Sequence, residues 1–205
     1  MNYLEIEKGI KHIYKNDRHL ARIIDLSGKC DLRPKKDYFL AILRAIIGQQ
    51  LSTFVAQKIF SRFLSYYGND ISPEKIIYAE DMELRNIGFS WAKIKYVKDF
   101  SIKILNEEIT LYGINKMSDE EIIKMLTKVK GISVWTVQML LIFTLGRLNI
   151  LPLGDFALRR AAKNVYGLRK IPDEKKLLFL SRKNNWSPYN SIASLYLWKS
   201  LELKE

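Results

Sequence analysis

The most informative part of the chain is residues 126–160, which read LTKVKGISVWTVQMLLIFTLGRLNILPLGDFALRR. This pattern predicts the end of one helix, a tight hairpin over Val129–Val134, a second helix, and a loop that places Asp155 before a third helix. A hairpin this short cannot satisfy its own backbone groups, so successive N–H groups and the start of the next helix face outward. We therefore expect the hairpin to bind phosphate oxygens and Asp155 to present a carboxylate.

Helix-boundary signals also occur along the rest of the chain. Ser118 and Glu121 form a capping-box pattern, and two short helices are expected within residues 3–27, with a break near Asn16 and Asp17. Further starts, of the cap or cap-then-proline type, are expected at Asp37, Ser52, Ser72–Pro73, Ser90, Pro172–Asp173 and Ser187–Pro188, the last helix running through Leu203. No segment alternates convincingly at period two, so the sequence predicts an all-α fold.

The charge balance points to a polyanionic partner. Lys and Arg outnumber Asp and Glu by 34 to 22, a net charge of +12. Such an excess favours nucleic acid or an acidic membrane surface, and general basicity without a partner is the alternative. No apolar run approaches eighteen residues and the N-terminal segment lacks a signal-peptide core, so we expect an intracellular protein of the cytoplasm, nucleoid or nucleus.

The scarcity of cysteine and histidine limits the catalytic groups that this protein could use. Cys30 is the only cysteine, which excludes an internal disulfide, a cysteine zinc site and a four-cysteine iron–sulfur cluster. The only histidines, His12 and His19, lie within the first twenty residues. The phosphate-binding motifs of nucleotide cofactors are absent. Catalysis is therefore expected to use carboxylates, lysines or backbone dipoles, with no required cofactor.

Four separated motifs resemble the helix-hairpin-helix DNA glycosylase superfamily. They are FLAILRAIIGQQLSTFVAQKI, KGISVWTVQMLLIF, LPLGDFALRRA and WSPYNSIASLYLW, in the family's order, and the resemblance covers residues 17–201. Within the superfamily, the chain is most similar to the 3-methyladenine DNA glycosylase II branch, in a short all-helical form. The family hairpin usually has a second glycine where this chain has Ser133.

The resemblance implies an architecture and an activity. The single domain of residues 1–205 would have two lobes, about 37–146 with the hairpin at 129–134, and 1–36 with 147–205, separated by an active-site cleft. It would act as a monomer on damaged double-stranded DNA, without a membrane. It would hydrolyse the N-glycosidic bond of flipped alkylated purines such as 3-methyladenine and 7-methylguanine.

The resemblance also assigns the catalytic residue and the base pocket. Asp155 matches the family's catalytic aspartate, although its position alone is that of an ordinary helix N-cap. Trp135 stands where members that also cleave DNA have a lysine, so a monofunctional enzyme is favoured. The other expected pocket residues are Met139 and Tyr189, with Phe39 and Trp91 as weaker candidates, and ordinary core packing is the alternative for each.

The DNA contacts are implied in the same way. The residue that fills the gap left by flipping is expected at Gln50 or Leu51, a turn that could equally be a plain helix connection. Phosphate contacts are expected from the backbone N–H groups of Gly131, Ser133 and Val134 and from the side chains of Arg159 and Arg160, which are otherwise solvated helix charges. A monovalent cation is expected at the backbone carbonyls of Thr127, Val129 and Ile132.

Two other functions remain open from the sequence. One is a non-catalytic DNA-binding helix-hairpin-helix protein in which Asp155 is only a cap. The other is a glycosylase for oxidised or deaminated bases.

Overall fold

The computed structural model describes residues 3–30, 32, 34–68 and 70–203. These residues form twelve α-helices, one 3-10 helix and no strand, which confirms the all-α prediction. None of the described helices is long and apolar enough to cross a membrane. The chain divides into a terminal unit, residues 1–34 with 141–205, and a central unit, residues 35–140. The lobe limits drawn from the sequence, at 37 and 146, stay a prediction.

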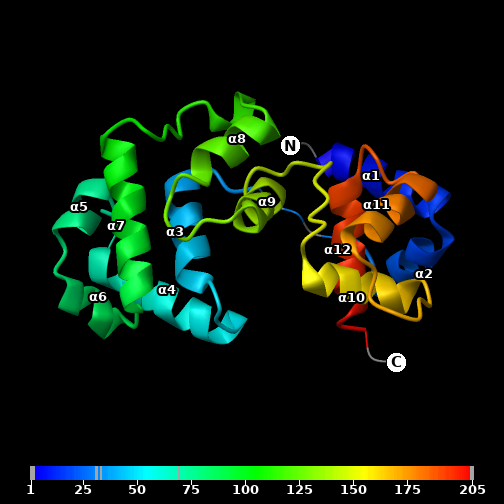
Figure 1. Cartoon of the computed structure of the whole chain (residues 1–205), viewed down its shortest axis with the longest axis horizontal. Helices are drawn as coiled ribbons and strands as arrows, with labels where there is room; N and C mark the ends of the chain where they lie inside the picture. Colours follow the sequence, from blue (N-terminus) through cyan, green and yellow to red (C-terminus); the bar gives the residue numbers. More distant parts are fainter. Residues whose placement is uncertain (1–2, 31, 33, 69, 204–205) are drawn as a thin grey trace. The chain divides into compact units, whose positions relative to one another are not determined.

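The terminal unit joins the two ends of the chain. It contains α1 (Tyr3–Asn16), α2 (Arg18–Ser27), α10 (Phe156–Val165), α11 (Glu174–Lys183) and α12 (Asn190–Ser200). Figure 1 shows the blue helices α1 and α2 beside the red helix α12, which also packs on α10, and α10 contacts α11. Ile13, Leu20, Trp186 and Tyr196 are completely buried in this unit. Burial of such large apolar side chains is the main stabilising contribution to a helical core of this kind.

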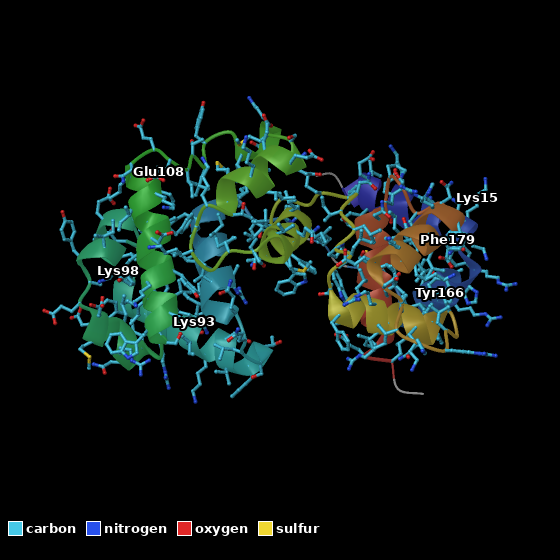
Figure 2. The ribbon with its side chains drawn as sticks, in the orientation of Figure 1. Lys15, Lys93, Lys98, Glu108, Tyr166 and Phe179 are labelled. Atoms are coloured by element: carbon cyan, nitrogen blue, oxygen red, sulfur yellow. The ribbon has the colours of Figure 1, made fainter. Side chains whose placement is uncertain are left out.

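A buried carboxylate lies at the junction of α1 and α2, where the sequence predicts a break. Asp17 has no exposed surface, and its Oδ1 accepts the backbone N–H groups of His19 and Leu20 at 3.0 and 3.1 Å, which caps α2. Its Oδ2 accepts the Trp186 Nε1–H at 2.8 Å and the hydroxyl of Tyr166, which follows α10 (Figure 2). Burial and the nearby Asp17 charge raise the pKa of Tyr166, so its hydroxyl stays protonated and donates.

The central unit is built around α3, α4 and α7. Its helices are α3 (Tyr38–Gly48), α4 (Thr53–Tyr67), α5 (Pro73–Tyr78), α6 (Asp81–Ile87), α7 (Trp91–Leu105), η1 (Ile114–Lys116), α8 (Asp119–Leu126) and α9 (Val134–Phe143). The unit boundary after Leu140 falls inside α9. Phe63 stacks on Phe89 with ring centroids 5.7 Å apart. From α7, the Lys98 ammonium donates to the Ala79 carbonyl at 2.8 Å, which ties α7 to the connection between α5 and α6 (Figure 2).

The helix starts follow the local capping signals. The side chains of Asp37, Ser52, Ser72, Ser90 and Asp173 each accept a backbone N–H of the following helix, and Ser118 with Glu121 forms the expected capping box.

The last helix differs from the prediction at both ends. It begins at Asn190 rather than at Ser187–Pro188, and it ends at Ser200 rather than Leu203. The N–H of Tyr189 donates to the Trp186 carbonyl at 2.7 Å, which closes a turn around Pro188. The start signal at the proline was therefore wrong because these residues form a turn before the helix.

Candidate active site

The hairpin between α8 and α9 has the open backbone that its sequence predicts. Gly131 has a φ of 81°, a conformation that favours glycine, and the Ile132 N–H donates to the Val129 carbonyl at 3.1 Å. The Ser133 hydroxyl accepts the Thr136 N–H at 3.3 Å, so this serine caps α9. Within the described part of the chain, the N–H groups of Gly131, Ser133 and Val134 have no acceptor. They are free to bind an external anion.

The turn between α3 and α4 is backbone-strained. Gln50 is exposed and has a φ of 56°, which few residues with a side chain adopt. The Leu51 N–H makes only a long hydrogen bond, 3.3 Å, to the carbonyl of Gly48, and Ser52 then caps α4. Such strain in a non-glycine residue is typical of functional sites.

The hairpin and this turn border one cavity in the central unit. Its volume is about 590 Å³, and six of the predicted site residues line it: Gln50, Leu51, Gly131, Ser133, Trp135 and Met139. Trp135 is 44% exposed and forms an aromatic wall of the cavity. An open cavity with an aromatic wall and several polar groups is the usual form of a small-ligand site.

A third wall of the cavity comes from the start of α7. Ser90, Ala92, Lys93 and Tyr96 line it (Lys93 is labelled in Figure 2). Partial burial lowers the pKa of the Lys93 ammonium group from its ordinary value. The sequence analysis did not assign these residues to the site. Ser90 predicts where α7 begins, but nothing in the local pattern places that start beside the hairpin.

Asp155 lies in the terminal unit, at the N-cap of α10. Asp155 is buried, with an exposed fraction of only 7%. Its Oδ1 accepts the Leu158 N–H at 2.5 Å. The same oxygen accepts the Nε1–H of Trp198 at 3.1 Å, and the Trp198 ring lies 5.9 Å from that of Phe143. Two donors and the positive end of the α10 dipole thus hold the carboxylate in one orientation. Trp198 was missed because it lies 43 residues from Asp155.

The model of the HhH-GPD superfamily of base excision DNA repair proteins matches residues 43–186, which include the hairpin, the turn after α3 and Asp155. The chain belongs to this superfamily.

Its relatives within the superfamily agree in name and in fold. DNA-3-methyladenine glycosylase 1 of Schizosaccharomyces pombe is 34% identical over 95% of this chain and 87% of the relative. The structure of the S. pombe 3-methyladenine DNA glycosylase in complex with abasic DNA has a TM-score of 0.85, with 32% identity over 96% of this chain and 97% of that one. The Bacillus halodurans DNA-3-methyladenine glycosidase has a TM-score of 0.79 and 34% identity, over 93% and 88%.

The remaining predicted site residues of this HhH-GPD protein do not line the cavity. In the central unit, the Phe39 ring stacks on Phe100 at 5.4 Å, and Trp91 is exposed with the Arg85 guanidinium 5.1 Å from its ring centroid. Their assignment to the base pocket stays a prediction without support from this cavity.

Three others lie in the terminal unit. Tyr189 packs on α1, where its ring is 5.2 Å from that of His12. Arg160 is exposed, whereas the Nε of Arg159 is buried with no hydrogen-bond partner among the described residues.

The carbonyls expected to bind a cation belong to the HhH-GPD hairpin. The Val129 carbonyl accepts the Ile132 N–H, and a carbonyl oxygen keeps a second lone pair for a cation. Among the described residues, no group of three or more His, Cys, Asp or Glu side chains could hold a metal ion.

Proposed function

We propose that this protein is a monofunctional DNA glycosylase that hydrolyses the N-glycosidic bond of alkylated purines in duplex DNA, the first step of base excision repair. The observation that carries this proposal is the cavity of the central unit, where Trp135 and Met139 lie beside a hairpin with open N–H groups. Relatives that are 34% identical over nearly the whole chain are named for 3-methyladenine, which supports the lesion class.

The chemistry of the lesion fits an aromatic wall. A purine nucleotide methylated at N3 or N7 carries positive charge, and aromatic faces attract cations as well as stacking on flipped bases. The positive base is also a good leaving group, so no histidine acid is needed. As the bond breaks, C1′ becomes cationic, and the Asp155 carboxylate stabilises that charge and orients the attacking water.

The absence of lyase activity is inferred from Trp135 and from the position of Lys130. Trp135 replaces the lysine that forms a Schiff base in lyase members. Lys130 does not line the cavity, and its Nζ lies 3.8 Å from Asp99. Lys93 does bring an amine to the cavity, so strand cleavage has to be measured separately from base release.

The proposed DNA contacts begin with the hairpin N–H groups that have no acceptor among the described residues. The N–H groups of Gly131, Ser133 and Val134 would bind strand phosphates, and Gln50 or Leu51 would fill the gap left by the flipped nucleotide. Arg159 and Arg160 would add charge beside that nucleotide. The carbonyls of Thr127, Val129 and Ile132 would hold a monovalent cation that supports the hairpin. A protein acting on genomic DNA would be intracellular.

The test is base release from methylated duplex DNA. We expect the wild-type protein to release 3-methyladenine, detected chromatographically without alkali, and to leave the strand intact at the abasic site. Borohydride should trap no covalent complex with abasic DNA. Tight duplex binding without release of any base would indicate the non-catalytic protein, and release only of 8-oxoguanine or hypoxanthine would indicate another lesion class.

Trp135→Ala should lower single-turnover release of 3-methyladenine about 30-fold, since stacking on one base contributes roughly 1–3 kcal/mol. Affinity for undamaged duplex should change little, because the hairpin N–H groups remain. The matched control is Tyr78→Ala, which removes another exposed aromatic side chain that does not line the cavity. Equal losses from both substitutions, or an equal loss of undamaged-duplex affinity, would count against a stacking role.

A further inference from the structure

One hydrogen bond connects the turn after α3 with the hairpin. The Gln49 side-chain amide donates its Nε2–H to the Gly131 carbonyl at 2.8 Å, across 82 residues of sequence. The acceptor is a carbonyl oxygen, so the group facing it must be the amide NH₂ rather than the amide oxygen. Gln49 and Gly131 both line the 590 Å³ cavity.

Gly131 is held from its other side by α7. A Cβ at this position would overlap Cδ2 of Tyr96, so the ring packs directly on the glycine backbone. The neighbouring Lys130 N–H donates to Asp99 Oδ2 at 2.9 Å. Tyr96 and Asp99 therefore fix the hairpin to α7. The Gly131 carbonyl of the hairpin is thus a fixed acceptor for the strained turn between α3 and α4.

The turn itself has few hydrogen bonds of its own. The Gln49 N–H donates to Ile46 at a long 3.4 Å, and Gln50 is in a strained backbone conformation, with φ of 56°. Strain of this kind persists only where surrounding contacts hold it. The Gln49 amide is such a contact, and it belongs to the residue next to Gln50.

We propose that Gln49 is a positioning residue that holds Gln50 at a fixed place relative to the phosphate-binding hairpin. When the hairpin N–H groups bind the strand phosphates, the side chain of Gln50 is already placed to occupy the gap left by a flipped nucleotide. Gln49 acts through Gln50 and need not touch the DNA. This inference rests on the proposed glycosylase function.

Gln49→Met tests the role because methionine has a similar length and no hydrogen-bond donor. Single-turnover base release should fall about tenfold, the factor that corresponds to one hydrogen bond. The affinity for undamaged duplex and the thermal midpoint should stay close to wild type. The matched control, Gln57→Met, changes an exposed glutamine of α4 that does not line the cavity, and its release rate should equal that of wild type.

A double-mutant cycle with Gln50→Ala separates positioning from an independent effect. If Gln49 acts through Gln50, Gln49→Met should change the release rate by less than about twofold once Gln50 is replaced by alanine. The inference would be overturned if the two substitutions lowered the release rate by factors that multiply in the double variant. It would also be overturned if Gln49→Met lowered the duplex affinity and the thermal midpoint in parallel with the release rate. Wild-type release is the internal reference: its absence would overturn the proposed function instead.

Discussion

Asp155→Asn should lower the single-turnover rate of 3-methyladenine release about 10³-fold, the usual effect of removing one electrostatic group from a transition state. Asparagine keeps an Oδ1 that can accept the N–H groups of Leu158 and Trp198, now at 2.5 and 3.1 Å, so the cap and the side-chain orientation are retained. The substitution removes the negative charge, and with it the stabilisation of a cationic C1′. Chromatography of the released base measures the rate.

The expected loss of rate in Asp155→Asn affects the bond-breaking step and not DNA binding, so DNA affinity has to be measured beside it. The affinity for duplex containing an uncleavable abasic analogue, measured by fluorescence anisotropy, should stay within a few-fold of wild type. Asp37→Asn is the matched control, because Asp37 caps α3 by accepting the Leu40 N–H at 2.9 Å and lies in the other unit. If Asp155→Asn kept more than a tenth of the wild-type rate, Asp155 would be only a helix cap.

The parts of the fold that the sequence predicted are those set by neighbouring residues. Asp37, Ser52, Ser90 and Ser118 cap the helices that they precede, because a cap bond joins residues only three positions apart. The same locality explains the hairpin, where Gly131 takes the positive φ that a tight turn requires. A local signal can still mislead, as Pro188 did, when a turn competes with the helix start.

The contacts that support the site join distant residues, and local patterns do not encode them. Trp198 donates to Asp155 from 43 residues away, and Gln49 donates to Gly131 from 82 residues away. A tryptophan in an apolar helix and a glutamine at a helix end each have an ordinary packing or capping interpretation. Only the three-dimensional arrangement gives their donor groups specific acceptors.

Phe39 shows the opposite difficulty. Its aromatic ring matched the chemistry of a base pocket, but the ring stacks on Phe100 and does not line the cavity. Aromatic side chains serve cores and sites equally well, so composition cannot separate the two roles. Lys93, which has no aromatic character, lines the cavity instead.

Asp17→Asn should lower the free energy of unfolding by about 3 kcal/mol, because buried hydrogen bonds to a charged group contribute roughly 1.5–3 kcal/mol each. The introduced asparagine could still cap α2 through its Oδ1, but its NH₂ group would face the Nε1–H of Trp186, now 2.8 Å from Oδ2 of Asp17. Indole nitrogen is only a donor, so that group would be left buried without an acceptor. Tyr166 could rotate its hydroxyl to accept from the new amide, which limits the loss.

Urea unfolding followed by tryptophan fluorescence measures the effect. The midpoint should fall at unchanged slope, and the thermal midpoint should drop by about 10 °C for a chain of this size. Asp173→Asn is the control, since Asp173 also caps a helix, accepting the Lys176 N–H at 2.7 Å, but is exposed. It should cost at most about 0.5 kcal/mol, because Asn and Asp cap equally well. Equal losses at the two positions would mean that the bonds from Trp186 and Tyr166 to Asp17 add nothing beyond the cap.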